Sequence, residues 1–563
     1  SLDDVLKNTI GSLDDTLQQS YSADFIKLKS ITKEETVKAF LRSSLRFISE
    51  QPQEQQEKLL NTMLNSVDEK YRLLIFKLIP RFNLHNTILK MVPLLSKDSS
   101  KDVQKAAIEA IREMFKGSGR ENTALEMLKP LLNIKDVDVR LFTLKAIGEI
   151  FEGTGNIDLF RELKPLLNDS NLGVRFNAIE TVGSIFRGTS NREILEMLRP
   201  LLSEPLEPVV DAVVGAIGKI FKGTGNMEIF EILRPFLKYK AEGRVWPASI
   251  AQRIVQNRVS EAIIELFKGS GRENEALNAL KPLLNDSSES VQRNIAYAIG
   301  KMFKGTGSID VLEALKPLLT AYNGNVRENA VEGIITTFKG SGRETDVLKA
   351  LKPLLEYPPN SDLANFFRGA AANVISEVFK DSGCENVVLD ELKLLLNSRD
   401  KYVRLFTTRI IGKVFEGTGN MDALEVLKPM LDDSYEGVRE DAIIAIGRIF
   451  KGSGDIGVFG ILKSALGDSS YSVRSAVAWA IGKVFEGTGN MDALEALKPM
   501  LGDSYKSVRD AAVESIVTVF KDSGCENDAL KALEALLNDK NEEAIRNAAA
   551  MAIKKIKEHS DML

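Results

Sequence analysis

The residue types that most often perform catalysis are scarce in this chain of 563 residues. It contains two histidines, His85 and His559, and two cysteines, Cys384 and Cys525. A metal site built on histidine would have too few ligands, and a serine or cysteine nucleophile would have no plausible base. Carboxylates are abundant, but no spacing singles out one acid–base pair among them. We therefore predict a protein that is not an enzyme, with no catalytic residue, no metal site and no cofactor.

Two kinds of glycine-containing turn are further candidates for chemistry. The recurring Gly-Thr-Gly and Gly-Ser-Gly segments are not phosphate-binding loops, because they follow predicted helices and lack the Gly-Lys-Ser/Thr ending. We expect them to end helices, since glycine adopts the left-handed conformation at little cost. Cys384 and Cys525 each lie in a Gly-Cys-Glu-Asn turn, where a helix N-terminus would lower the thiol pKa. Duplication of the turn explains the pair more simply than a redox role, and we predict free thiols.

The turns belong to a repeat that recurs twelve times, mostly at intervals of 35 or 36 residues. A fixed period in this range is typical of stacked supersecondary units. The interval is longer in two places, which predicts insertions near residues 238–247 and 357–361. The repeat is marked by a phenylalanine at 115, 151, 186, 221, 267, 303, 338, 379, 415, 450, 485 and 520.

Each repeat contains two predicted helices. In the unit at 490–520, Asn490 is a suitable N-cap for a helix A, whose apolar stripe includes Leu494 and Leu497. Pro499 lies within this stretch, in a slot that holds ten of the seventeen prolines, and we expect it to kink helix A. A helix B follows from about residue 506 to Phe520.

The pattern Leu-x-Pro-Leu-Leu-x-Asp-x-x-x-x-Val-Arg-x-x-Ala-x-x-Ala-Ile resembles HEAT repeats, in particular the short type of the phycobilin lyases. The resemblance implies an all-α fold, a right-handed α-solenoid of about 14–15 stacked helical hairpins that forms a HEAT-like superhelix. Residues 1–82 would form an N-terminal cap and degenerate helical repeats, 83–557 the repeat array, and 558–563 a C-terminal tail. The Asp before helix B could bond the Arg of its own or of a neighbouring repeat, which would set the stacking register.

A candidate binding surface follows from the helical period. Slots two, six and ten residues after the Val of helix B form one stripe away from the core, and helix B usually lines the concave side of HEAT arrays. The stripe is acidic near 257–265 and 328–332, and basic near 293–301, 405–413 and 444–483. Large or charged residues on it, with a tryptophan of the first insertion, are the predicted protein-binding residues: Leu141, Phe176, Trp246, Tyr297, Leu405, Arg409, Ile444 and Trp479.

Aromatic anchors surrounded by charge are typical of binding hot spots. The alternative is that the helical phase differs slightly and these side chains pack against the next repeat. For Trp246 the alternatives are contact with a partner and coverage of the end of an extended helix B.

We therefore predict a non-catalytic scaffold or adaptor that binds a protein or peptide along the concave helix-B surface. One alternative is a phycobilin-lyase-like chaperone or chromophore-handling protein. Another is binding of a nucleic-acid backbone along a ladder of cations that follow the repeat phenylalanines. The helix dipole also explains that ladder, and a net charge of −5 disfavours nucleic acid. The cations are Lys116, Arg187, Lys222, Lys268, Lys304, Lys339, Lys380, Lys451 and Lys521.

The chain contains no run of 18 apolar residues and no basic, apolar leader at its first residues. We expect a cytoplasmic protein without a membrane partner. The sequence does not indicate an oligomeric state.

Overall fold

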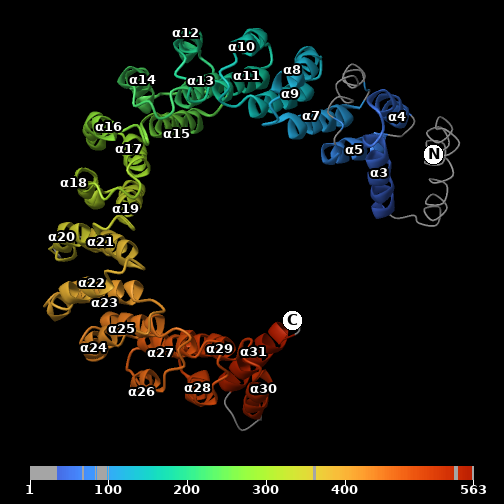
Figure 1. The fold of residues 1–563 in the computed structure, drawn as a ribbon. Coiled ribbons are helices and arrows are strands. Elements are labelled where there is room, and N and C mark those ends of the chain that lie inside the picture. Colours follow the sequence, from blue (N-terminus) through green and yellow to red (C-terminus); the bar gives the residue numbers. More distant parts are fainter. Residues whose placement is uncertain are drawn as a thin grey trace. The chain divides into compact units, whose positions relative to one another are not determined.

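Helices make up the regular secondary structure of the described residues. The computed structural model describes residues 34–65, 69–82, 84, 98, 100–358, 363–537 and 543–560. The chain divides into two compact units, unit 1 (Ser1–Ala276) and unit 2 (Leu277–Leu563), and each is described by itself. Within each unit, consecutive helices pair into stacked A–B hairpins (Figure 1), which confirms the prediction of an all-α, HEAT-like solenoid.

Unit 1 begins with the helices α3 (Glu34–Ser49), α4 (Gln53–Asn65) and α5 (Glu69–Leu78) and the 3₁₀ helix η1 (Ile79–Arg81). Its later B helices are α7 (Lys101–Phe115), α9 (Val137–Ile150), α11 (Leu172–Ile185), α13 (Glu207–Ile220) and α15 (Ala248–Phe267). Its later A helices are α8 (Glu121–Leu128), α10 (Ile157–Leu163), α12 (Arg192–Leu198) and α14 (Met227–Leu233), and α16 (Glu273–Leu280) spans the division.

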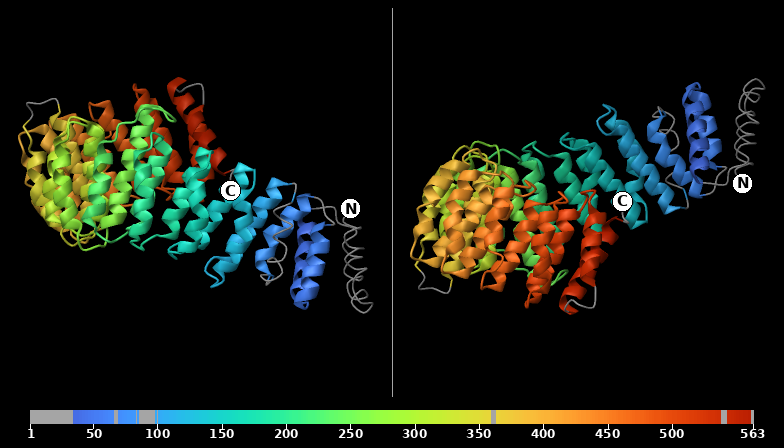
Figure 2. Two further views of the ribbon diagram at one scale, coloured as in Figure 1. Left: turned by 90° about the horizontal axis from the view of Figure 1, so that it is seen from above. Right: turned by 90° about the horizontal axis from the view of Figure 1, so that it is seen from below.

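The B helices of unit 2 are α17 (Glu289–Met302), α19 (Gly324–Phe338), α21 (Ala364–Phe379), α23 (Lys401–Val414), α25 (Glu436–Ile449), α27 (Tyr471–Val484), α29 (Lys506–Phe520) and α31 (Glu543–Ser560). Its A helices are α18 (Ile309–Leu315), α20 (Glu344–Leu355), α22 (Glu385–Leu392), α24 (Met421–Leu427), α26 (Ile456–Ser464), α28 (Met491–Leu497) and α30 (Glu526–Glu534). Figure 2 shows how the neighbouring helices of this unit, coloured from yellow-green to red, run side by side.

The prediction that proline kinks helix A is wrong for most repeats, because the α-helix ends before the proline. In the repeat at 490–520, α28 ends at Leu497 and a 3₁₀ helix begins at Lys498, with Pro499 in its first turn. Proline lacks an N–H and its ring collides with the carbonyl four residues back, so the chain changes to the tighter i→i+3 pattern. In α20 alone among the described A helices, the proline, Pro353, lies inside the helix.

The 3₁₀ segments follow the same plan along the chain. Those with proline in the first turn are η1, η2 (Lys129–Asn133), η3 (Lys164–Asn168), η4 (Arg199–Ser203), η5 (Arg234–Lys238), η6 (Lys281–Asn285), η7 (Lys316–Thr320), η9 (Lys428–Asp432) and η10 (Lys498–Gly502). Two others, η8 (Leu395–Asn397) and η11 (Ala535–Leu537), contain no proline. Proline therefore suits this turn but is not required for it.

The core of each repeat lies between helix A and helix B and continues into the next repeat. In the repeat around α27, Val473, Ile481 and Phe485 have no exposed surface, and neither do Leu494 and Leu497 of the following helix A. These are the slots that the repeat pattern assigns to the core, so the predicted helical phase of the framework residues is correct.

Small residues allow neighbouring B helices to approach closely. A Cβ at Gly412 of α23 would lie 2.5 Å from the Cβ of Ala445 in α25, and one at Gly482 of α27 would lie 2.7 Å from the Cβ of Ser515 in α29. The A helices are shorter and do not pack on one another in this way. The B helices consequently form the inner row of the curve that each unit follows, and the A helices form the outer row (Figure 1).

The Gly-Thr-Gly turn has a second role that the sequence did not reveal. Besides ending its own helix B, it donates backbone N–H groups to the last turn of the next one: Gly487 N–H to Thr518 O (3.0 Å) and Gly489 N–H to Val519 O (2.9 Å). The last carbonyls of an α-helix have no partner inside the helix, so each turn completes its neighbour. The same paired bonds are donated by residues 153 and 155, 188 and 190, 223 and 225, 305 and 307, 417 and 419, and 452 and 454.

An arginine near the start of helix B also joins adjacent repeats. Arg439 of α25 donates from Nε and Nη2 to the Asp468 carboxylate of the next repeat (2.8 and 2.9 Å) and from Nη1 to the Asp433 carbonyl of its own turn (2.9 Å). The sequence left open whether the arginine bonds within its own repeat or with a neighbour, and it does both. In unit 2 the carboxylate bond recurs in Arg368–Asp400, Arg404–Asp433 and Arg474–Asp503.

The first insertion is anchored by a buried carboxylate. Glu207, in the first turn of α13, has no exposed surface and accepts the backbone N–H groups of Arg244 (2.7 Å) and Val245 (3.0 Å). Burial works to raise the pKa of Glu207, but these backbone donors outweigh it and hold the pKa below its ordinary value. The loop therefore has a fixed attachment to α13 before α15 begins.

Some of the predicted segments lie wholly or partly outside the described residues. The cap expected within residues 1–30, His85 and part of the insertion at 357–361 lie outside them. The tail expected from residue 558 begins within α31, which continues to Ser560. Among the described residues, no helix is both long and apolar enough to cross a membrane.

We expect the substitution Gly412→Ala to destabilise unit 2 by about 1–3 kcal/mol, because the new methyl group overlaps Ala445 in a packed interface. Gly460→Ala is the matched control, since Gly460 lies in α26 with no atom near the position of a Cβ. That substitution should stabilise the chain by about 0.5–1 kcal/mol through helix propensity. Urea unfolding followed by circular dichroism measures both. Equal effects of the two substitutions would contradict the close approach of α23 and α25.

We expect Asp468→Asn to lower stability at pH 7 by about 1–2 kcal/mol, the range for a hydrogen bond to a charged group that is partly exposed. The bond from Arg439 lowers the pKa of Asp468. The stability that this bond contributes is therefore complete above the ordinary aspartate pKa of about 4, and it is lost as the pH falls through the lower pKa of the folded state. The variant should therefore lose less stability than the parent between pH 5 and pH 2.

Asp432→Asn is the control for this measurement, because Asp432 is exposed at the same kind of turn and has no ion pair among the described residues. Urea midpoints at several pH values should coincide for Asp432→Asn and the parent chain. A parallel pH dependence for Asp468→Asn and the parent would show that the Arg439–Asp468 bond does not contribute.

Candidate functional site

The predicted binding residues lie on or beside the row of B helices, with different degrees of exposure. Tyr297 of α17 is 36% exposed, and Arg409 of α23 is also exposed. The remaining six are half-buried: Leu141, Phe176, Trp246, Leu405, Ile444 and Trp479. The stripe is thus neither core nor free surface, and the role of each residue depends on its neighbours.

Three of these side chains pack over glycines of an adjacent B helix. A Cβ at Gly437 would lie 3.2 Å from Leu405 Cδ1, and one at Gly447 would lie 3.1 Å from Trp479 Cζ3. Leu141 Cδ2 lies 4.0 Å from the corresponding position at Gly173. For Leu141, Leu405 and Trp479 the structure therefore favours the alternative of packing between repeats.

Arg409 also makes a contact between repeats. Its Nη2 donates to Asp441 Oδ2 of α25 at 2.9 Å, and its guanidinium lies 5.5 Å from the ring centroid of Phe406. Burial raises the pKa of the Asp441 carboxyl above its ordinary value, and the charge of Arg409 opposes that shift. The arginine thus compensates a buried carboxylate, although 44% of its side chain is exposed.

Ion pairs between B helices occupy much of the stripe. In unit 1, Arg258 of α15 holds Asp211 of α13 through two bonds of 3.2 Å, and Lys219 of α13 pairs with Glu180 of α11. Asp211 is almost fully buried and its pKa is raised by that burial despite the arginine. Charged residues on these parts of the stripe already have partners within the chain.

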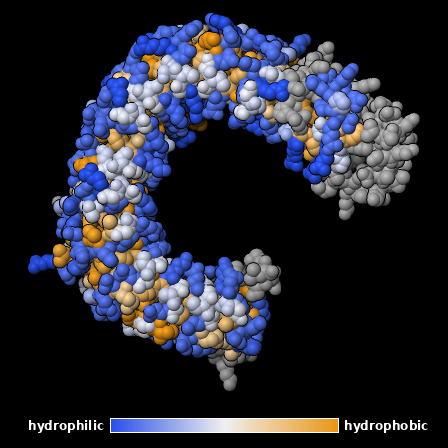
Figure 3. Space-filling view, in the orientation of Figure 1, coloured by the Kyte–Doolittle hydropathy of each residue, from blue (hydrophilic) through white to orange (hydrophobic). Residues whose placement is uncertain are grey.

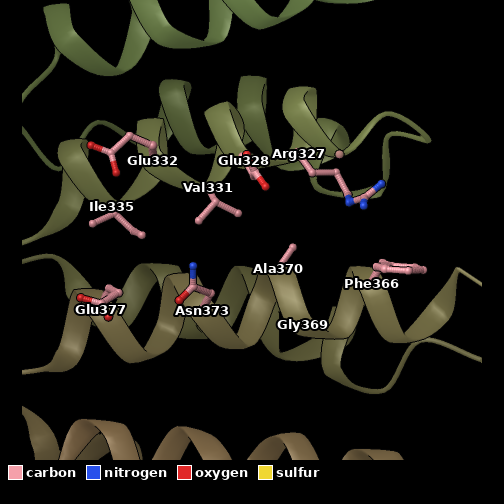
Figure 4. A pocket seen from close by; sticks show the side chains of 11 residues that line it. Arg327, Glu328, Val331, Glu332, Ile335, Phe366, Gly369, Ala370, Asn373 and Glu377 are labelled. Carbon is pink, nitrogen blue, oxygen red and sulfur yellow. The ribbon is translucent and has the colours of Figure 1, made fainter.

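The junction between α19 and α21 in unit 2 is different, because a groove of about 510 Å³ opens there. Figure 4 shows side chains of the two parallel helices facing each other across it. Its floor and walls combine apolar and acidic groups. The lining residues are Gly324, Arg327, Glu328, Val331, Glu332, Ile335, Phe366, Gly369, Ala370, Asn373 and Glu377.

The groove is acidic along most of its length. Within the described residues, Glu328 and Glu377 have no ion-pair partner within 4.0 Å, whereas Glu332 lies 3.5 Å from Lys301 of α17. Arg327 and Phe366 mark the other end, with the guanidinium 5.2 Å from the ring centroid. Arg327 also donates to the carbonyls of Ala321 (2.7 Å) and Tyr322 (2.8 Å), so its orientation is fixed.

The predicted stripe on the B helices includes part of this groove, but the sequence did not identify the groove as a binding site. The acidic segment at 328–332 was recognised from the sequence, and Gly369, Asn373 and Glu377 occupy stripe slots on α21. They are small, polar or acidic, so a rule that selects large apolar side chains does not include them. Acidic residues on both helices next to a glycine were the available signal. In Figure 3 the visible face of unit 2 is a mosaic of hydrophilic and hydrophobic residues, which matches this mixed character.

The cation ladder is partly engaged within the chain. Lys222 lies 3.1 Å from Glu265 and Lys380 lies 2.6 Å from Glu416, each in the following repeat. The hydrogen bond between Lys380 and Glu416 raises the pKa of the lysine and lowers that of the glutamate. Longer pairs hold Lys116, Arg187 and Lys451. Five of the nine ladder cations are thus paired within the chain, whereas Lys268, Lys304, Lys339 and Lys521 have no ion pair among the described residues.

The residues with potential redox or metal chemistry are dispersed. Cys384 and Cys525 are free, half-buried thiols at the N-termini of α22 and α30. Within the described part of the chain, no cluster of three or more His, Cys, Asp or Glu side chains could hold a metal ion.

The comparisons with known proteins concern the fold. Residues 460–554 match the family of HEAT repeats, so this part of the chain is a HEAT-repeat region. None of the curated proteins compared with the chain matches it. Nothing in the comparisons supports the narrower resemblance to phycobilin lyases.

Among solved structures, a mutant of Kap121p is 12% identical, with 98% of this chain and 68% of that chain covered and a TM-score of 0.47. Yeast importin-beta (Kap95p) is also 12% identical, with 99% of each chain covered and a TM-score of 0.37. Similarities of this size carry no information about what this chain binds.

We expect Arg409→Ala to destabilise unit 2 by about 1–2 kcal/mol at pH 7, because it leaves the Asp441 carboxylate buried without its cation. A raised folded pKa means that the protonated form suits the fold, so stability is retained below the ordinary pKa and lost as the pH rises through the folded value. The deficit relative to the parent should therefore shrink between pH 7 and pH 4, as measured by urea unfolding.

Adding Asp441→Asn to the Arg409→Ala variant provides the control, since no carboxylate then needs compensation. Its stability difference from the parent should vary little with pH. A pH-independent deficit for Arg409→Ala alone would rule out the compensating role of Arg409.

Proposed function

We propose that this chain is a non-catalytic scaffold that binds a protein or peptide partner along the B-helix row of unit 2. The observation that carries the proposal is the groove between α19 and α21, with its acidic side chains and apolar floor. Ligand sites in proteins are concave, and their volumes of roughly 300–1,000 Å³ include the volume found here. Tyr297, the exposed aromatic of the neighbouring α17, lies on the same row.

The local charge supports a protein partner more than a nucleic acid. Glu328, Glu332 and Glu377 would repel a phosphate backbone, and five of the nine cations that follow the repeat phenylalanines pair with glutamates of the chain. Electrostatic attraction supplies most non-specific binding of nucleic acids, and the groove offers the opposite sign. No observation in the structure favours the chromophore-handling alternative.

The B-helix row can be tested by photo-cross-linking in cells that produce the protein. Tyr297 is replaced by p-benzoylphenylalanine, and the same replacement at Tyr322, which is 82% exposed in the turn before α19, is the matched control. We expect a discrete adduct at Tyr297 that excess unmodified chain suppresses, because the partner contacts the B helices. Adduct formation at Tyr322 with none at Tyr297 would contradict the proposal.

A further inference from the structure

We propose that the α19–α21 groove binds a short lysine- or arginine-containing segment of the partner protein. This inference rests on the proposed function and adds the chemical nature of the segment. It follows from the like charges facing each other across the groove, from the absence of an ion pair between α19 and α21 among the described residues, and from the shape of the floor.

The two walls carry charge of the same sign. Glu328 and Glu332 project from α19, and Glu377 projects from α21 together with the neutral Asn373 (Figure 4). At several other junctions a cation on one B helix meets a carboxylate on the next, as in the Arg258–Asp211 and Arg409–Asp441 pairs. At this junction, no ion pair joins α19 to α21 among the described residues. A cation of a bound partner would form ion pairs with these carboxylates, which no cation of the facing helix does among the described residues.

Arg327 lines one end of the groove and Lys413 of α23 donates to Asn373 Oδ1 (3.3 Å), but among the neighbouring cations only Lys301 forms an ion pair with a lining carboxylate within the described residues. Lys301 lies 3.5 Å from Glu332, and the two side chains are 37% and 58% exposed. Exposed pairs of this kind contribute between zero and about 1 kcal/mol. A ligand cation can therefore replace Lys301 at little cost, and Lys301 retains its contact with the ring of Tyr297, 5.6 Å from the centroid.

The floor suits the aliphatic part of a long basic side chain. Val331 and Ile335 line it on α19, and Gly369 and Ala370 leave space on α21 because they have little or no side chain. Lysine and arginine bury their methylene stems on apolar surface while the charged head reaches a polar group. Such a side chain would contact Val331 or Ile335 along its stem and Glu328, Glu332 or Glu377 at its head.

The length of the groove limits the ligand to a short segment. From Arg327 to Ile335 the α19 backbone rises about 12 Å at 1.5 Å per residue. An extended peptide covers that distance with about four residues. The guanidinium of Arg327 and the exposed ring of Phe366 lie at one end, which leaves the acidic end for the basic residue.

The test uses the full chain and a fluorescein-labelled peptide, Gly-Leu-Lys-Leu-Lys-Leu-Gly, with a counterpart in which glutamate replaces both lysines. Fluorescence anisotropy measures binding at low and at physiological salt. We expect the basic peptide alone to bind, and Glu328→Lys or Glu377→Lys to weaken its binding at least fivefold, because each change replaces an attraction with a repulsion.

Glu313→Lys is the matched control, because it makes the same charge change at an exposed glutamate of the A helix α18, which has no ion pair among the described residues. It should alter affinity less than twofold, and circular dichroism should show unchanged helicity for all three variants. Equal weakening by Glu313→Lys and Glu328→Lys, or equal binding of the acidic peptide, would overturn the assignment of the groove.

The outcome is independent of the cross-linking result. An adduct at Tyr297 together with a basic peptide that ignores Glu328→Lys would reject the basic segment but retain a partner on the B-helix row. Peptide binding that depends on Glu328 and Glu377, without any adduct at Tyr297, would support the groove and contradict the wider partner surface.

Discussion

Satisfaction of backbone groups at the end of helix B is the constraint on which the rest of the fold depends. The last carbonyls of a helix need donors, and here the preceding repeat provides them through its glycine turn, as Gly487 and Gly489 do for α29. Where a turn forms this pair of bonds, as seven of the described turns do, the donors sit at fixed positions and the following B helix has one permitted register against its neighbour. The Arg439–Asp468 bonds hold the opposite end of the same helices, and a repeat is therefore complete only when the next one is in place.

This constraint also accounts for the two unequal rows within each unit. The B helices are held at both ends and approach closely through residues such as Gly412 and Gly482. The A helices stop early, where the chain changes to a 3₁₀ turn at residues such as Pro499, and they cover the B row from outside. Long helices packed tightly on one side and short ones on the other require curvature, and the curvature places the B-helix stripe on the inner side of each unit.

The sequence was sufficient for features that repeat and insufficient for features that differ between repeats. The core slots of Val473 and Phe485 recur in every unit, so their helical phase could be inferred from the spacing alone. The change at Pro499 from an α-helix to a 3₁₀ helix depends on local backbone geometry, which the spacing does not encode. The acceptor of the Gly487 N–H, the Thr518 carbonyl of the next repeat, could not be assigned from the sequence, because the distance between a turn and the next helix is a property of the stack.

The candidate site shows the same division more sharply. The eight predicted binding residues are half-buried or exposed, whereas the stripe slot of Asp211 is buried, and the availability of each slot depends on the facing residue of the next helix. Trp479 is covered because Gly447 lets it pack closely, and Arg409 is engaged because Asp441 faces it. At α19 the facing residues are small or of like charge, so Glu328 stays accessible. The binding capacity of such a surface is therefore determined by mismatches between adjacent repeats: where neighbours complement each other the side chains serve the fold, and where they do not, the side chains are available to a partner.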